Sequence, residues 1–230
     1  MTDVLIGVFD LDRGSTGDAL LLSADEQQRA QRLTFDVHRE RYIAGRAAVR
    51  RTLGDVVGAD PAGLVFHYGE HGRPDVEGHG AVSFNFSNSE SVGILAVCLT
   101  ARIGVDVEKV RPDFADLRVA DRFFAAGETA RLQGLPADER NLAFLRCWTR
   151  KEALLKAVGA GLTLPLRDFE VSFEADEPAR LLVAGPVLGA DGWQLLDVSD
   201  AAAGYIGAVA VAASGAIVCS AHREPQGQPG

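Results

Sequence analysis

The sequence contains little sulfur and few aromatic residues, and it has less positive than negative charge. It has three cysteines, one methionine and 7% aromatic residues, and its formal net charge is −9. The cysteines stand singly at positions 98, 147 and 219 with no Cys-x-x-Cys pair, which excludes a disulfide framework and a cysteine-based zinc site. We therefore expect reduced thiols and a cytoplasmic protein.

The sequence also lacks a hydrophobic run long enough to cross a bilayer. The apolar stretch 204–218 is shorter than the roughly 20 residues that a spanning helix needs, and its glycine, alanine and valine content favours a pair of buried strands. Residues 1–12 have no basic segment before their short apolar run, so we expect no signal peptide. The acidic net charge disfavours nonspecific binding to nucleic acid or anionic membranes, and we expect neither partner.

The positive charge is concentrated in one segment. Between Arg29 and Arg51 lie seven arginines, at positions 29, 32, 39, 41, 46, 50 and 51, against two acidic residues, Asp36 and Glu40. A basic segment in an acidic chain predicts a localised anionic partner.

Hydrophobic spacing and turn residues predict an alternation of helices and strands. Helices are expected over 24–33, 39–53, 118–124, 128–132 and 139–158. Strands are expected over 4–9, 64–68, 81–86, 92–99, 104–108, 169–173, 193–198 and 205–211, with a loop over 67–80. Gly54 and Gly58 are expected to end the second helix, and Gly159 and Gly161 the last one.

The order of these elements repeats along the chain. Aligning Gly54 with Gly159 gives, in both halves, a helix, a glycine stop, a loop with proline, a strand and a strand pair. We therefore predict an α+β fold in which a tandem duplication forms a pseudo-dimer with the active site between the halves. The expected units are an N-terminal half over 1–102 and a C-terminal half over 103–221, and residues 222–230 are expected to be a disordered tail.

Acidic side chains recur on two of the predicted elements. Trp148, Glu152 and Lys156 are spaced by four residues and share one face of the last long helix. Asp106 and Glu108 are two apart on a strand and share one of its faces. Each pattern alone is more often a solvated surface. Together they offer three carboxylates and an ammonium from two rigid elements, an arrangement suited to holding a hard divalent cation against a phosphorylated ligand.

These segments resemble a known family. Gly104-Val105-Asp106-Val107-Glu108, followed by Trp148-x-x-Lys151-Glu152-Ala153-x-x-Lys156 and Gly159-x-Gly161-Leu162, is similar to motifs of the 4′-phosphopantetheinyl transferases of the Sfp (surfactin synthetase activator) type. Gly72-Arg73-Pro74 and Ser83-Phe84-Asn85-Phe86-Ser87 resemble that family's first motif in order and spacing. The resemblance runs from about residue 29 to residue 173, and it implies a pseudo-dimeric α+β fold and a monomer.

The resemblance implies a reaction and its partners. Coenzyme A, the co-substrate, would lie between the halves and give its 4′-phosphopantetheine to a conserved serine of an apo acyl, polyketide or peptidyl carrier protein, releasing 3′,5′-ADP. Mg²⁺ or Mn²⁺ would be held by the residues that match metal-binding carboxylates: Asp106, Glu108 and Glu152. Lys156 matches a phosphate-contacting lysine. The base that takes the serine proton stays open between Glu152, acting directly or through bound water, and Glu128, whose alternative is a first-turn partner of its helix dipole.

The resemblance also implies a set of coenzyme A contacts. They are Arg29, Arg41, Gly72, Arg73, Pro74, Asn85, Phe86, Ser87, Asn88, Asp106 and Lys156. Position 88 departs from the family, which has a histidine there. Since asparagine cannot carry positive charge, we expect a weaker grip on the 3′-phosphate, or compensation by Arg29.

Two other functions remain open from the sequence. A non-catalytic coenzyme A- or carrier-binding module would fit Asn88, but it would not need all three carboxylates. A hydrolase of the coenzyme A pyrophosphate would also use a divalent cation, but the glutamate-rich helix typical of such enzymes is missing from the sequence.

Overall fold

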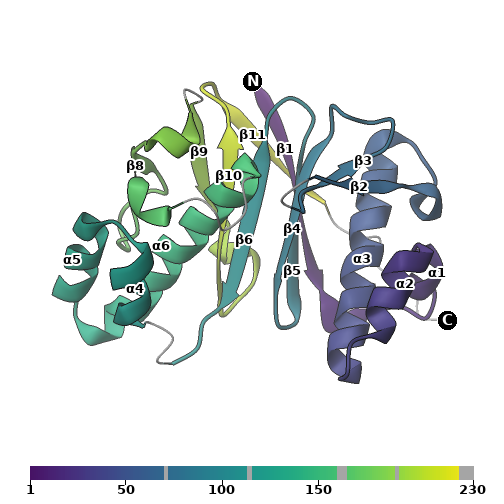
Figure 1. Ribbon diagram of the computed structural model, residues 1–230, viewed down its shortest axis with the longest axis horizontal. Helices are drawn as coiled ribbons and strands as arrows, with labels where there is room; N and C mark the ends of the chain where they lie inside the picture. Colours follow the sequence, from purple (N-terminus) through teal and green to yellow (C-terminus); the bar gives the residue numbers. More distant parts are fainter. Residues whose placement is uncertain (70–71, 113–115, 160–164, 190–191, 223–230) are drawn as a thin grey trace.

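The computed structural model describes residues 1–69, 72–112, 116–159, 165–189 and 192–222. The tail 223–230 and two residues of the late motif, Gly161 and Leu162, lie outside this part of the chain. The described residues form an α+β fold in which the strands lie in the middle and the helices lie on the two outer sides (Figure 1). The predicted fold class is confirmed. No helix in the described ranges is both long and apolar enough to cross a membrane.

The two halves contain matching elements. The first half comprises β1 (Thr2–Asp10), α1 (Asp18–Leu21), α2 (Ala24–Gln31), α3 (Asp36–Val57), β2 (Phe66–Tyr68), β3 (Pro74–Val76), β4 (Ser83–Ser89) and β5 (Val92–Cys98). The second comprises β6 (Ile103–Lys109), α4 (Leu117–Phe123), α5 (Ala126–Gly134), α6 (Ala137–Val158), β7 (Glu170–Val171), β8 (Leu181–Val183), β9 (Trp193–Asp197) and β10 (Tyr205–Ala212), and β11 (Ile217–His222) follows it.

The sheet topology supports the predicted repeat. One sheet has the order β11-β1-β5-β4 and the other the order β6-β10-β9. In the first half, β5 pairs antiparallel with β1 and with β4. In the second half, β10 pairs antiparallel in the same way with β6 and with β9. The long helices α3 and α6 both have 22 residues and both end at a left-handed glycine, Gly58 with φ +68° and Gly159 with φ +76°. Gly58, not Gly54, is therefore the counterpart of Gly159, and the predicted alignment was wrong by four residues.

Gly54 lies inside α3, where its missing side chain permits close packing. A Cβ atom at this position would approach the Ala59 carbonyl oxygen to 2.8 Å and Pro61 Cγ to 2.9 Å. A glycine needed for contact and a glycine needed for a left-handed turn look alike in a sequence, which explains the misalignment.

The last strand also differs from expectation. β11 pairs in parallel with β1, from Thr2 opposite Ile217 to Gly7 opposite His222. Residues 217–222 therefore return to the N-terminal sheet and do not pack as part of the C-terminal half, and His222 is in a strand, not in a disordered tail. Strand β3 lies within the predicted loop 67–80 and pairs with β2. The strand propensity of a segment does not say which other strand it pairs with, so the pairing of β11 with β1 could not be predicted. β3 has only three residues, which is too short for an alternating pattern to be recognised.

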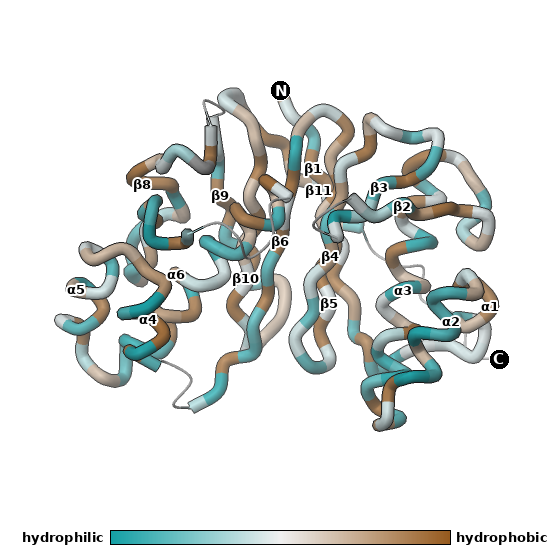
Figure 2. The backbone as a smooth tube through the Cα atoms, viewed as in Figure 1, coloured by the Kyte–Doolittle hydropathy of each residue, from teal (hydrophilic) through white to brown (hydrophobic). Residues whose placement is uncertain are grey.

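Three hydrophobic clusters hold the fold together. One packs α3 against the N-terminal sheet, and another packs α6 with α4, α5 and the C-terminal sheet. The third lies between the sheets and includes Ile94, Val105, Val107 and Val209. Figure 2 shows the contrast between the hydrophobic residues of β10 and the hydrophilic outer helix α2. The central cluster joins the halves by packing β1 and β5 against β6 and β10.

The edge strands β4 and β6 are joined by side chains. Ser83 Oγ accepts from the Ile103 amide at 3.1 Å, Asn85 Oδ1 from the Val105 amide at 2.8 Å, and Ser89 Oγ from the Lys109 amide at 3.1 Å. Alternate residues of a strand share a face, so one polar face of β4 supplies acceptors to the open edge of β6. We call this junction of β4 and β6 the seam.

Candidate active site

The seam carries the predicted acidic residues. Val105 and Val107 point into the central core at 0% and 1% exposure, and the alternation of the strand directs Asp106 and Glu108 to the opposite face. Gly104 lets α6 lie directly on β6, because a Cβ atom there would come within 2.2 Å of the Ala153 carbonyl oxygen. This close approach brings the α6 side chains to the strand.

Asp106 is at the centre of a hydrogen-bonded group. It is 5% exposed, and its Oδ1 atom accepts from Lys156 Nζ at 2.6 Å and from Ser87 Oγ at 3.0 Å. Lys156 Nζ also donates to Ser87 Oγ at 2.9 Å. Glu108 Oε2 accepts from Ser89 Oγ at 3.0 Å. The structure thus brings together the α6 lysine, the β6 carboxylates and the β4 serines.

The carboxylates of this group influence one another. Burial, and then the negative charge of Asp106, raises the pKa of Glu108 and of Glu152. Burial likewise raises the pKa of Asp106, although Lys156 opposes this shift. Among the described residues, Asp106 Oδ2 and Glu152 Oε1 are buried without a hydrogen-bond partner. Burying unpaired carboxylate oxygens is costly, so the group favours a proton or a cation.

The donor atoms fit a hard divalent cation, but the present arrangement is not a finished coordination site. Three carboxylates with two unpartnered oxygens provide the ligand type that Mg²⁺ prefers. Within the described ranges, however, no three His, Cys, Asp or Glu side chains converge closely enough to hold an ion as they stand. The ammonium of Lys156 occupies one oxygen of Asp106. The shared metal site of Asp106, Glu108 and Glu152 stays a prediction.

A cleft of about 650 Å³ lies on the other side of β4. Seven of the predicted coenzyme A contacts line it: Arg29, Arg41, Gly72, Pro74, Asn85, Phe86 and Asn88. Gly72 has φ +79°, a conformation that favours glycine. Asn85 lines the cleft and also bonds to β6, so β4 is the wall shared by the cleft and the seam. The predicted contacts Ser87, Asp106 and Lys156 are on the seam side.

Arg73 is held by hydrogen bonds within the chain and does not line the cleft as its neighbours Gly72 and Pro74 do. Its guanidinium donates to the Ala157 carbonyl oxygen and to Ser83 Oγ, both at 2.6 Å, and burial lowers its pKa. The side chain therefore links the β2–β3 region to the end of α6. These contacts make Arg73 a joint between the halves, and its contact with coenzyme A stays a prediction.

The arginine-rich segment is largely neutralised by carboxylates that are distant in sequence. Arg41 bonds both oxygens of Asp12, at 2.6 and 3.0 Å. The other ion pairs of the segment are Arg39–Asp36, Arg46–Glu26, Arg50–Glu26 and Arg51–Asp18. Arg29 instead lies over the Tyr42 ring, 5.8 Å from its centroid. The segment is thus less basic than its sequence suggests.

Glu128 lies elsewhere, inside the C-terminal half. It is 0% exposed, pairs with Lys151 Nζ at 2.7 Å, and accepts from the amides of Ala125 at 2.9 Å and Val171 at 2.8 Å. A carboxylate enclosed in this way cannot reach a hydroxyl on another protein. We therefore do not retain Glu128 as a candidate base, and Glu152 remains.

Trp148 has a packing role. Its ring stacks on Phe144 with centroids 6.3 Å apart and an interplanar angle of 8°, and it also contacts Phe123 and Phe124. This aromatic group ties α4 to α6, the helix that carries Glu152.

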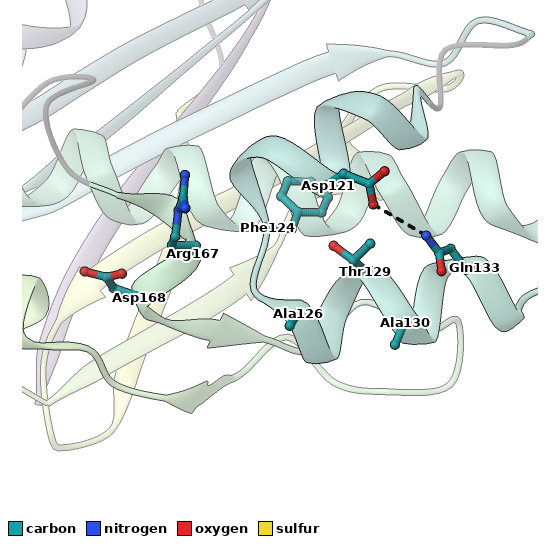
Figure 3. A pocket seen from close by; sticks show the side chains of 8 residues that line it. All are labelled: Asp121, Phe124, Ala126, Thr129, Ala130, Gln133, Arg167 and Asp168. Carbon is teal, nitrogen blue, oxygen red and sulfur yellow. Dashed lines mark hydrogen bonds between the residues drawn. The ribbon is translucent and has the colours of Figure 1, made fainter.

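A second cavity of about 540 Å³ lies between α4, α5 and the 3₁₀ turn Leu166–Asp168 (Figure 3). Asp121 and Gln133 face each other across part of it, with a hydrogen bond of 3.4 Å. None of the predicted site residues lines this cavity. The candidate site is therefore the seam together with the cleft behind β4.

Several cleft residues were not predicted. They are Leu33, His38, Tyr42, Gly45, Arg46, Tyr68, Phe84, Glu90 and Arg111. His38 and Tyr42 are four apart on α3, so their shared face was detectable. The sequence does not show which face of α3 borders the cleft, so the spacing of these two residues did not identify them as cleft residues.

Comparison with known proteins agrees with this geometry. A family model described as the 4′-phosphopantetheinyl transferase superfamily matches residues 102–209. The chain is 38% identical over 183 residues to the 4′-phosphopantetheinyl transferase HetI of Nostoc sp., a match that covers 78% of this chain and 74% of that protein. It is 32% identical over 155 residues to a 4′-phosphopantetheinyl transferase of Bacillus subtilis, covering 67% and 68%. It is 29% identical over 157 residues to the 4′-phosphopantetheinyl transferase Sfp of Bacillus subtilis (strain 168), also covering 67% and 68%. The chain therefore belongs to the 4′-phosphopantetheinyl transferase superfamily.

Proposed function

We propose that this protein transfers 4′-phosphopantetheine from coenzyme A to a serine hydroxyl of an apo carrier protein, releasing 3′,5′-ADP. The observation that carries the proposal is the pair of buried, unpartnered carboxylate oxygens on Asp106 and Glu152, next to Lys156. A binding module without chemistry would have no use for this costly group. Family membership supports the same reaction over a non-catalytic role.

Coenzyme A spans the two sides of β4 in this proposal. Its nucleotide occupies the cleft, where Arg29 supplies positive charge and the main chain at Gly72 and Pro74 forms part of the wall. Its pyrophosphate reaches the seam beside Lys156. The side chain of Lys156 is 30% exposed, and its ammonium then contacts phosphate oxygens while keeping Asp106 in place.

The reaction is a phosphoryl-type displacement. The carrier serine oxygen bonds to the phosphorus that bears pantetheine, and the bond from that phosphorus to the bridging oxygen breaks, so that 3′,5′-ADP leaves. The serine proton passes to one oxygen of the Glu152 carboxylate, and the other oxygen is left for the cation. Burial and the charge of Asp106 raise the pKa of Glu152, which makes it a stronger base than an ordinary glutamate.

A divalent cation, Mg²⁺ or Mn²⁺, completes the proposed site. Asp106, Glu108 and Glu152 would hold it, and when bound it would neutralise charge that develops on the pyrophosphate. The unpartnered oxygens of Asp106 and Glu152 support this assignment.

We also propose a cytoplasmic monomer. Both halves of the pseudo-dimer are present in one chain, so the site requires no second copy. Cys98, Cys147 and Cys219 are all free, which agrees with a reducing compartment.

A mass-shift assay tests the proposal. Apo acyl, polyketide and peptidyl carrier domains are each mixed with the protein, coenzyme A and Mg²⁺, and the intact carrier mass is recorded. We expect the phosphopantetheine mass on at least one carrier, and its loss with a chelator or with Glu152→Gln. Glu139→Gln, an exposed change on the same helix, is the matched control and should transfer normally. No mass gain on any carrier, with coenzyme A still bound in calorimetry, would support the non-catalytic module instead.

A further inference from the structure

Most of the arginines that line the cleft are already paired with carboxylates of the same chain. Four of the arginines that line the cleft are Arg29, Arg41, Arg46 and Arg111. Three of these are already held by carboxylates: Arg41 by Asp12 at 2.6 Å, Arg46 by Glu26 at 2.6 Å, and Arg111 by Glu90 at 2.8 Å. Their charge is largely balanced before any ligand arrives.

Two basic groups on the cleft wall are exceptions, Arg29 and His38. For these two side chains, the described part of the chain places no carboxylate within ion-pair distance. His38 lies in the first turn of α3, is exposed, and meets Phe35 edge-on with ring centroids 5.8 Å apart. Arg29 comes from the neighbouring helix α2. The basic side chains of the cleft that have no carboxylate partner among the described residues therefore lie at the corner between α2 and α3.

Tyr42 completes this corner. It is one turn after His38 on α3, and its ring lies under the Arg29 guanidinium at 5.8 Å. Burial raises the pKa of Tyr42, so its hydroxyl remains protonated and can donate. The corner thus offers a guanidinium, an imidazole and a phenol, all of them hydrogen-bond donors suited to an anion with several oxygens.

Asn88 lines the same cleft from β4 and is neutral. It can donate a hydrogen bond but adds no charge. A doubly charged phosphomonoester in the cleft would therefore find the basic side chains without a carboxylate partner at the α2–α3 corner.

We propose that His38, together with Arg29, binds the 3′-phosphate of coenzyme A and so determines the preference for coenzyme A over its 3′-dephospho form. This inference rests on the proposed function, in which the pyrophosphate lies at the seam and only the 3′-phosphate is left for the corner. His38 is a specificity-determining residue here and has no part in the bond rearrangement.

Calorimetry with two ligands tests this role without requiring turnover. The Kd values of coenzyme A and 3′-dephospho-coenzyme A are measured for the wild type, His38→Ala and His38→Arg. We expect His38→Ala to weaken coenzyme A binding about tenfold, as loss of one solvent-exposed charge-assisted hydrogen bond would. Binding of the dephospho form should change less than about twofold, and His38→Arg should restore the preference to within about threefold of the wild type.

His67→Ala is the matched control. This histidine is also exposed and pairs with Glu77 at 3.0 Å, but it does not line the cleft. We expect it to change neither Kd. If His38→Ala leaves the ratio of the two Kd values unchanged, or weakens both ligands equally, the proposal is wrong. Because binding is measured directly, these outcomes are distinct from failure of the transfer reaction, which the mass-shift assay reports separately.

Discussion

Replacing Glu128 with alanine should destabilise the protein strongly while leaving its chemistry in place. Glu128 and Lys151 are both 0% exposed, and they pair at 2.7 Å between α5 and α6. Without the carboxylate, Lys151 Nζ keeps the carbonyl oxygens of Leu166 at 2.8 Å and Phe169 at 2.5 Å. Its ammonium also keeps the Phe169 ring, 4.3 Å from the ring centroid, but no anionic partner, and a buried charge without its ion-pair partner typically costs about 3–5 kcal/mol.

This loss can be expressed as a shift in thermal midpoint. For a chain of this size, each kcal/mol corresponds to about 2–4 °C, so we expect a decrease of about 6–20 °C. The shift is measured by thermal unfolding followed by circular dichroism, and the free energy of unfolding by urea titration. The double variant Glu128→Leu with Lys151→Met removes both charges, and it should recover most of the stability because charge-free packing often replaces such pairs.

Activity distinguishes a structural role of Glu128 from a catalytic one. Well below its midpoint, Glu128→Ala should transfer phosphopantetheine within a few-fold of the wild-type rate. Glu152→Gln should lose about 10²–10⁴-fold, the usual contribution of a general base. A Glu128→Ala variant with an unchanged midpoint and a hundredfold lower rate would refute our reasoning and return Glu128 to the list of bases.

Three further changes test other parts of the structure. Burial, and then the charge of Asp106, raise the pKa of Glu152, so the contribution of Glu152 to the free energy of unfolding is lost as pH rises. In the presence of a chelator at pH 7.5, Glu152→Gln should therefore be more stable to urea than the wild type. This difference in stability should decrease toward pH 5. Gly104→Ala should force β6 away from α6 and lower the urea midpoint by the equivalent of about 3 kcal/mol, whereas Gly58→Ala, which meets open space at φ +68°, should cost only about 1–2 kcal/mol. Arg73→Met should lower the thermal midpoint but leave the calorimetric Kd of coenzyme A within about twofold; a tenfold loss of affinity would show that Arg73 contacts the nucleotide after all.

The sequence allowed the local directions of side chains to be predicted, because they follow from the geometry of single elements. The spacing of Asp106 and Glu108 on a strand, and of Glu152 and Lys156 on a helix, correctly predicted which residues share a face. The long helix α6 was predicted to within two residues at its start and correctly at its end. Its length and its strong periodicity made this possible.

Contacts between distant segments could not be predicted in the same way. Four arginines of the arginine-rich segment pair with Asp12, Asp18 and Glu26, which lie outside the segment and have no spacing relation to it. The enclosure of Glu128 depends on Lys151, which is 23 residues away on another helix. These pairs depend on how α2, α3, α5 and α6 pack, and no local pattern records that packing.

The polar face of β4 shows why the seam can hold the candidate active site. On most strands, alternating polar residues such as Ser83, Ser87 and Ser89 would face water. Here they face the edge of β6, where Ser83 and Ser89 accept backbone amides and Ser87 meets Asp106. Two duplicated sheets that met through hydrophobic edges would leave those amides unpaired and offer no polar lining for buried carboxylates. The residues that join the halves are therefore also the ones that make a buried acidic group tolerable, so the joint between the repeats and the candidate active site are one structure.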